Sequence, residues 1–365
     1  MLFNITSIVV GLIVAGILFM RLYPVFGRRP SKTKVQAFRK SEHLVDGKFV
    51  NLTSTIMDTS LKTMYSTLKD FIKGNPNGRP HRPLPMANTS FQQSNHAQFT
   101  WFGHSASMLN MEGKTLLLDP MFGNAPSPLP SFGIKRYSGG LPFKVEELPV
   151  IDAVLLSHDH YDHLDYGSIR KIKHKVNNFL VPLGVGSHLE RWGVDPAKIQ
   201  EYDWWDELQF EGLTLVCTPA KHFSGRSLSD RNATLWCSWV IKGEHTRVFF
   251  SGDSGYAPHF KEIGDKYGPF DLALIECGQY DERWADIHMM PEESVQAHLD
   301  VNAKLMIPIH WAGFTLAFHD WMDPIERVTR AAKARNVAIS TPKIGETVFI
   351  GAADFPQITW WRQED

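Results

Sequence analysis

Short apolar runs alternate with turns and helical stretches from about residue 97 to the end of the chain. Runs of this length that are bounded by turn residues predict β-strands. They are AQFTWF, TLLLDP, IDAVLLS, NFLVP, LTLVCTP, ATLWCSWVI, TRVFFSGD, FDLALIE and AKLMIPIH. Helices are predicted in GSHLERWG, FKEIGDKYG, PEESVQAHLDV and DPIERVTRAAKAR. This order of elements indicates an α/β (α+β) protein in which helices cover packed sheets.

The amino-terminal run, residues 1–20, carries no charged side chain. A membrane span needs about 20 mostly apolar residues. The run has no basic start and no A-x-A cleavage site, so it predicts an uncleaved single-span anchor over residues 1–22 rather than a signal peptide. A buried helix of a globular body is disfavoured because the run is apolar all round.

Basic residues follow this run closely: Arg21, Arg28, Arg29, Lys32, Lys34, Arg39 and Lys40. By the positive-inside rule they place the remaining chain in the cytoplasm. They could also hold the chain to anionic lipid, or form a solvated linker.

An amphipathic helix is predicted in DTSLKTMYSTLKDFIKG, with Asp58 as its N-cap and Gly74 at its end. Its apolar stripe predicts packing against the body of the protein, with a membrane-facing or dimer-facing role as the alternative. A proline-rich linker follows over residues 75–85. The predicted organisation is an anchor (1–22), a basic linker, helix and proline-rich arm (23–96), and a catalytic domain (97–365).

The composition of the chain bears on which classes of function are expected. Hydrophobic residues make up 43% of the chain and charged residues 21%, as in ordinary globular proteins. The net charge of −1 gives no electrostatic footprint for nucleic acid, so no nucleic-acid partner is expected. Cys217, Cys237 and Cys277 lie in apolar runs and are too widely spaced for a zinc knuckle, which indicates buried thiols.

Metal-binding side chains follow several predicted strands. In SHDHYDHLD (residues 157–165), a turn after the strand IDAVLL could direct two imidazoles at one cation, and a carboxylate with a third imidazole at another. These nitrogen and oxygen ligands suit Zn²⁺. Two cations about 3.5–4 Å apart can share a hydroxide nucleophile at neutral pH. His222, Asp253 and His310 also follow predicted strands.

The spacing His158-x-His160-x-Asp162-His163 resembles the metal-binding motif of the metallo-β-lactamase superfamily. The resemblance extends to TPAKHFSGR, FFSGDSGY and IPIHWAGF. It implies an αββα sandwich with two Zn²⁺ ions at one edge. The implied ligands are His158, His160 and His222 for one metal, Asp162, His163 and His310 for the second, and Asp253 as the bridge.

A closer resemblance runs from about Phe99 to Pro324, to the family of N-acyl-phosphatidylethanolamine-hydrolysing phospholipase D. It rests on WFGHSASMLNMEGKTLLLDPMF, ELPVIDAVLLSHDHYDHLDYGSI, VPLGVGSHLERWGV, EYDWWDE, SGDSGYAPHFKEIGDKYGPFDLALI and HWAGFTLAFHDWMDP. It implies hydrolysis of a membrane phospholipid to phosphatidic acid and an N-acylethanolamine. The hydrophobic leader departs from the animal enzymes of this family, and Glu276 and Cys277 stand where a more apolar segment is expected.

Two further histidines enter the predicted site through the resemblance. It places His104, in WFGHSA, near the metals, as an outer-sphere or substrate residue or as a packed structural histidine. It places His288, in DIHMMPEE, near the substrate phosphate, and the candidate catalytic residues are then Asp162, Asp253 and His288.

The sequence leaves several alternatives open. Mn²⁺ and Fe²⁺ remain compatible with the ligand set. The alternative activities are those of a sugar-phosphate lactonase or a soluble-diester phosphodiesterase, and a non-catalytic membrane scaffold or metal-binding module is a further alternative. A homodimer is compatible with the sequence.

Overall fold

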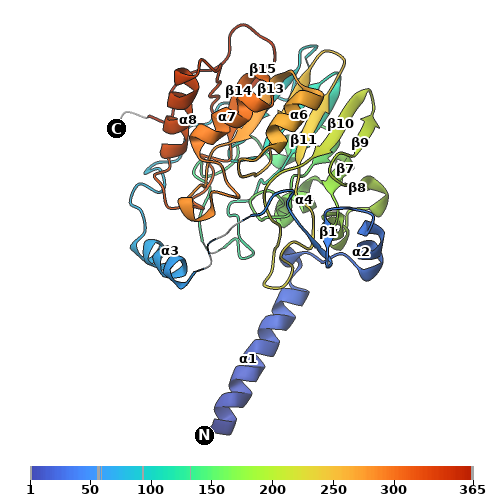
Figure 1. Ribbon diagram of the computed structural model, residues 1–365, viewed down its shortest axis with the longest axis vertical. Coiled ribbons are helices and arrows are strands. Elements are labelled where there is room, and N and C mark those ends of the chain that lie inside the picture. The colour runs from blue at the N-terminus through green and yellow to red at the C-terminus, as the bar shows by residue number, and fades with distance from the viewer. Residues whose placement is uncertain (1, 56–57, 59, 93, 132, 363–365) are drawn as a thin grey trace.

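Two β-sheets pack face to face in the computed structural model, which describes residues 2–55, 58, 60–92, 94–131 and 133–362 (Figure 1). The seven-stranded sheet has the order β15-β3-β4-β5-β6-β7-β8, and the six-stranded sheet the order β14-β13-β12-β11-β10-β9. The first contains β3 (Gln98–Trp101), β4 (Ser107–Met111), β5 (Lys114–Leu118), β6 (Ile151–Leu155), β7 (Val176–Pro182), β8 (Ile199–Tyr202) and β15 (Thr347–Phe349). The second contains β9 (Glu207–Phe210), β10 (Leu213–Thr218), β11 (Ser238–Lys242), β12 (Arg247–Phe250), β13 (Phe270–Glu276) and β14 (Ala303–Ile309). A short hairpin, β1 (Leu44–Val45) and β2 (Lys48–Phe49), lies outside both sheets.

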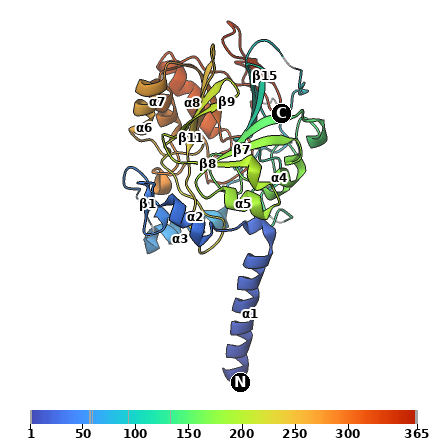
Figure 2. The same cartoon turned by 90° about the vertical axis from the view of Figure 1, so that its right-hand side faces the viewer.

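Helices cover the outer face of each sheet, as Figure 2 shows. α4 (Tyr166–Ile172) and α5 (Gly186–Arg191) belong to the seven-stranded side, where their apolar residues share a core with β6 and β7. α6 (His259–Tyr267), α7 (Pro291–Asp300) and α8 (Asp323–Ala334) lie on the six-stranded side, where α7 packs on β13 and β14. The predicted αββα sandwich is therefore confirmed.

Consecutive residues of the buried strands pack into different cores. Leu116 and Leu118 of β5 belong to the cluster that includes Leu215 of the opposite sheet, whereas Leu117 packs with Ile169 of α4. Successive side chains of a strand point to opposite faces. A strand covered on both faces is therefore apolar at every position, which explains the unbroken run in TLLLDP.

The differences from the predicted strands have local causes. β4, β8, β9 and β15 were not predicted, and each is short and includes polar residues. Within ATLWCSWVI only the part from Ser238 onward is a strand. Leu235 and Trp236 are nevertheless buried, because this apolar stretch is a loop packed inside the protein rather than an edge strand. All three cysteines are buried and free, as predicted.

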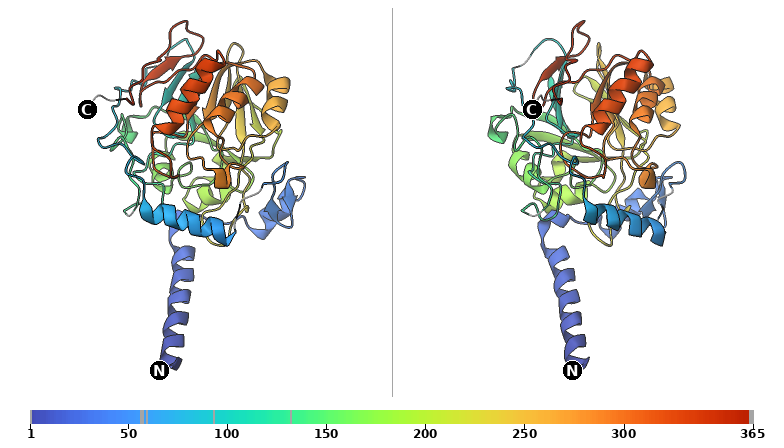
Figure 3. Two further views of the ribbon diagram at one scale, coloured as in Figure 1. Left: turned by 60° about the vertical axis from the view of Figure 1, so that its left-hand side comes forward. Right: turned by 90° about the vertical axis from the view of Figure 1, so that its left-hand side faces the viewer.

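The helix α3 (Leu61–Lys73) forms, but its predicted packing is wrong (Figure 3). Its apolar residues are all exposed, with Phe71 and Ile72 each 75% exposed. The polar side of the helix faces the body instead, where the Asp70 carboxylate lies 2.9 Å from the Arg283 guanidinium. The N-cap is Ser60, which accepts a hydrogen bond from the Thr63 N–H, and not Asp58 as predicted.

The prediction of an amino-terminal membrane anchor is also wrong. The run does form a helix, α1 (Leu2–Leu22), which projects from the body in all views (Figures 1–3). None of the helices among the described residues is long and apolar enough to cross a bilayer. The cytoplasmic placement of the catalytic domain, inferred from the positive-inside rule, loses its basis with the span. The domain boundaries at residues 97 and 365 stay a prediction.

Candidate metal centre

Histidine and aspartate side chains from both sheets meet at one edge of the sandwich. The loop from His158 to His163 follows β6 and leads into α4. His222, Asp253 and His310 follow β10, β12 and β14, whose carboxyl ends share one edge because these strands are mutually parallel. The structure thus brings every predicted metal ligand into one cluster of side chains.

The first group consists of His158, His160 and His222. The His160 Nδ1 atom lies 2.9 Å from His158 Nε2 and 3.2 Å from His222 Nε2. His222 Nδ1 contacts the Ile287 carbonyl at 3.0 Å, which directs its Nε2 atom into the group. Ligands about 2.0–2.1 Å from a tetrahedral cation lie roughly 3.3–3.5 Å from each other, so this spacing suits a single metal.

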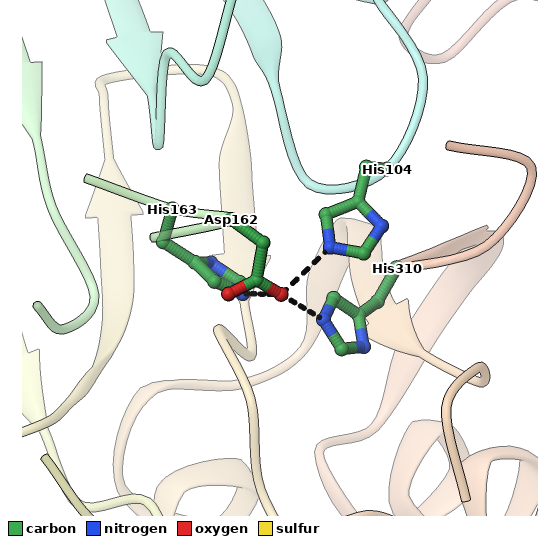
Figure 4. Close-up of side chains that lie close together, drawn as sticks. All are labelled: His104, Asp162, His163 and His310. Carbon is green, nitrogen blue, oxygen red and sulfur yellow. Dashed lines mark hydrogen bonds and ion pairs between the residues drawn. The ribbon is translucent and has the colours of Figure 1, made fainter. Parts of the chain in front are cut away.

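The second group lies around the Asp162 carboxylate (Figure 4). Asp162 Oδ2 lies 3.2 Å from His310 Nε2, 3.5 Å from His163 Nε2 and 2.9 Å from His104 Nε2. His104 reaches this position through backbone hydrogen bonds between its turn and the end of β14, in which the His310 N–H donates to the His104 carbonyl. Both histidines adopt positive φ, 56° and 64°, a costly conformation for residues other than glycine.

Asp253 lies between the two groups. Its Oδ2 atom is 3.0 Å from His163 Nε2 and 3.2 Å from His310 Nε2 on one side. On the other side it is 3.8 Å from His158 Nε2 and 3.9 Å from His222 Nε2. Its Oδ1 atom is buried and has no hydrogen-bond partner among the described residues. The imidazole nitrogens around Asp253 and its unpaired Oδ1 atom are suitable ligands for a divalent metal. A bound metal would also compensate the cost of burying the unpaired oxygen.

The protonation of the two groups differs in the absence of metal. Burial holds the pKa of His158 and His222 well below the usual range, so these imidazoles are neutral. Burial also opposes protonation of His163 and His310, but the carboxylates around them, Asp253 first, raise both pKa values, that of His310 to about 10. Protons therefore compete with metal for this second group.

His104 has a different relation to the centre. Burial lowers its pKa to about 3, so its ring is neutral and its Nε2–H can donate to Asp162. This hydrogen bond orients a candidate ligand, as the outer-sphere alternative for His104 requires.

Two carboxylates of the site were not among the predicted site residues. Asp119 follows β5, and its Oδ2 atom accepts a hydrogen bond from His163 Nδ1 at 2.7 Å. Glu276 ends β13 and accepts a hydrogen bond from His288 Nδ1 at 2.9 Å. Both stand directly after short apolar runs, LLL and LALI, and that position was the available sequence signal.

An open cavity of about 230 Å³ lies over the cluster. His160, Asp162, Asp253 and His310 form part of its wall, together with His288 from the loop before α7. The rest of the lining is Gln279 and four apolar residues: Phe223, Trp284, Ile287 and Leu316. Candidate metal ligands, a further histidine and mostly apolar side chains thus face one space.

The metal-binding loop is held from behind by Arg226, which is buried. Its guanidinium donates to the carbonyls of Asp159 at 2.5 Å and Leu164 at 2.8 Å, near the start of the run His158–His163 and directly after its end. It also donates to the Val25 carbonyl at 2.8 Å. Val25 lies between α1 and α2 (Lys32–Phe38). Arg226 therefore connects this segment by hydrogen bonds to the loop that carries the candidate ligands.

Replacing Arg226 by Met should destabilise the protein and loosen the metal-binding loop. Each buried carbonyl left unpaired costs about 1–3 kcal/mol, so we expect a loss of roughly 3 kcal/mol or more in the free energy of unfolding. Urea unfolding of the metal-free protein measures it. The control is Arg170→Met on the surface of α4, where a change within about 0.5 kcal/mol is expected. Equal effects of the two substitutions would contradict the bracing role.

Comparison with known proteins agrees with this geometry. Residues 114–311 match the family described as Beta-lactamase superfamily domain. An uncharacterized protein of Mycobacterium tuberculosis is 40% identical over 330 residues, covering 88% of each chain. N-acyl-phosphatidylethanolamine-hydrolyzing phospholipase D 1 of Caenorhabditis elegans is 34% identical over 269 residues, covering 69% of this chain and 75% of that protein.

A solved structure shares the fold at low sequence identity. It is the isothiocyanate hydrolase from Delia radicum gut bacteria, with a TM-score of 0.54, 19% identity, and coverage of 69% of this chain and 98% of that one. The two-sheet sandwich, the clustered histidines and aspartates at its edge and the family match lead to one conclusion. The chain belongs to the metallo-β-lactamase superfamily and is a metal-dependent hydrolase.

Proposed function

We propose that the protein is a two-metal phosphodiesterase that hydrolyses N-acyl-phosphatidylethanolamine to phosphatidic acid and an N-acylethanolamine. The observation that carries the two-metal assignment is the position of Asp253 Oδ2 between two ligand groups, 3.0 Å from His163 and 3.8 Å from His158. The resemblance to phospholipase D relatives, including the nematode protein, supports the substrate. Zn²⁺ is the proposed metal because the ligand atoms are imidazole nitrogens and carboxylate oxygens, although Mn²⁺ and Fe²⁺ accept the same ligands.

The metal ligands divide into a pair of sites bridged by one carboxylate. We assign His158, His160 and His222 to one ion, Asp162, His163 and His310 to the other, and Asp253 to both. Divalent cations bound there would polarise the phosphate oxygens and lower the pKa of water to near neutrality. Asp119 and His104 hold the ligands His163 and Asp162 in orientation through hydrogen bonds.

We propose that His288 acts on the leaving group of the phosphodiester. Its Nδ1 atom is bound to Glu276, and its ring lines the cavity 5.2 Å from the His310 ring. From there it can hydrogen-bond the phosphate or protonate the departing alkoxide. The apolar residues of the cavity wall, Phe223, Trp284, Ile287 and Leu316, suit the hydrocarbon near a lipid phosphate.

Lipid product analysis tests the proposal. Purified zinc-loaded protein incubated with mixed phospholipid vesicles should produce phosphatidic acid and N-acylethanolamine in equal amounts, detected by mass spectrometry. His288→Gln should lower the rate by roughly 100-fold or more, as expected for loss of a general acid. Faster hydrolysis of water-soluble esters or diesters than of vesicle lipid would instead favour a lactonase or a soluble-diester phosphodiesterase. No turnover of any of these substrates would point to a non-catalytic metal-binding module.

A further inference from the structure

The side chain of Glu276 is fully buried at the end of β13, after an apolar strand, and contacts two histidines of the site. We propose that Glu276 is a positioning residue that sets the ring orientation of both His310 and His288. Neither the sequence resemblance nor the ligand motif assigns it a role. The inference rests on the proposed function only for the role of His288, because the contacts themselves belong to the hydrolase site.

The two oxygens of Glu276 have separate partners. Oε1 accepts hydrogen bonds from the backbone N–H groups of Met289 at 3.0 Å and Ser254 at 3.2 Å. These bonds fix the carboxylate between the segment that follows Asp253 and the segment that follows His288. Oε2 faces the imidazoles, 2.9 Å from His288 Nδ1 and 3.3 Å from His310 Nδ1.

This arrangement determines which nitrogen of each ring is left for the site. A carboxylate facing Nδ1 favours a hydrogen on that nitrogen, which directs Nε2 toward the site, as a lone pair for a metal on His310 and as the proton-carrying atom on His288. His310 Nε2 then points to Asp162 and Asp253, 3.2 Å from an oxygen of each. The opposite edge of His288 is left for the cavity, of which this residue forms part of the wall.

The cost of burying this carboxylate supports a specific role. Among the described residues, no lysine or arginine forms an ion pair with Glu276, and its charged partners can only be the two histidines. An apolar residue would fill the end of a buried strand at lower cost. A carboxyl side chain at this buried position is therefore explained by the two imidazoles that it holds in place.

A direct role in metal binding is the competing explanation. Ligand atoms of Asp253, Glu276, His288 and His310 all lie within 4.8 Å of one another. However, Oε1 is already occupied by two N–H donors, and the distance from Oε2 to His288 Nδ1 is that of an ordinary hydrogen bond. The hydrogen bond with His288 and the ion-pair contact with His310 thus account for the position of Glu276 without a third cation.

The experiment compares Glu276→Gln, which keeps the size but loses the charge, with Glu276→Asp, which keeps the charge. The control is Glu262→Gln, at an exposed position of α6. Three readouts apply to each variant: metal content and zinc affinity by competition with a chromogenic chelator, the ¹⁵N chemical shifts of labelled histidines, and kcat and KM for bis(4-nitrophenyl) phosphate. The first two do not require the proposed substrate, so failure of the substrate assignment would leave the test intact.

In Glu276→Gln we expect the zinc affinity of the site that contains His310 to fall roughly 10- to 100-fold, as for other outer-sphere partners of metal ligands. The ¹⁵N chemical shifts of His288 should show that the Nδ1–H tautomer is no longer favoured. The fold-decrease in kcat should exceed the fold-change in KM. Glu276→Asp should recover part of the affinity and of the tautomer, and serves as the test if the Gln variant does not fold. Unchanged shifts and affinity in folded variants would overturn the inference. Loss of a third metal equivalent would overturn it as well, by making Glu276 a ligand.

Discussion

Chelation of divalent metal is expected to abolish hydrolysis, and Zn²⁺ is expected to restore it. The ring nitrogens of His158 and His222 lie 2.9 and 3.2 Å from His160 Nδ1, an arrangement that suits binding of one cation. Without metal, the site has no group that can lower the pKa of water to neutrality. Activity should therefore fall to the background rate, the largest effect expected from any change to this protein.

Elemental analysis of active protein supplies the quantitative check. Two metal ions per chain are expected, one for each ligand group. Protons compete for His163 and His310, whose pKa values are raised, so this group should lose its metal first as the pH falls. Mg²⁺, which prefers oxygen ligands, is the control for restoration and should be ineffective. Full activity with one metal per chain would contradict the two-metal site.

Replacing Asp253 by Asn should give the second-largest loss. The substitution keeps the shape but removes the charge that faces both ligand groups, and an amide is a poor bridge between cations. The loss in kcat should exceed the roughly 10- to 100-fold cost of removing an outer-sphere partner. Metal content should also drop, because like-charged ions would lie close together with one negative charge fewer between them.

The matched control is Asp265→Asn on the exposed side of α6, where Asp265 forms a surface ion pair with Lys261. This variant should retain the activity and metal content of the unmodified protein, since exposed ion pairs contribute little. Steady-state kinetics and elemental analysis on the same preparations compare the two. Near-normal turnover of the Asp253 variant would show that this residue does not bridge the metals.

Much of the fold was predictable from the chain because local pattern and burial agree there. β5, β6 and β13 are covered on both faces over most of their length, so their runs LLL, AVL and LALI are apolar without alternation and are easily recognised. The short edge strands β8 and β15 face solvent and carry mixed residues, and no pattern distinguishes them from loops. The candidate ligands were predictable for a chemical reason: His158-x-His160-x-Asp162-His163 puts more metal-binding groups in one turn than packing or solubility requires.

The features that escaped prediction depend on partners distant in sequence. α3 is amphipathic, and pattern alone indicated a buried apolar side, but the ion pair of Asp70 with Arg283 turns its polar side to the body.

The uncharged start of the chain indicated a span, yet no helix among the described residues meets the length and apolarity that a bilayer imposes.

The chain sequence therefore specified which side chains could bind metal and which strands are buried, because both follow from residue type and local spacing. The roles of Asp119 and Glu276 emerged only from the folded protein. A carboxylate orients an imidazole only when folding places its oxygen within hydrogen-bond distance. Asp119 meets His163, and Glu276 meets His288 and His310, across strands and loops whose relative positions no local pattern encodes.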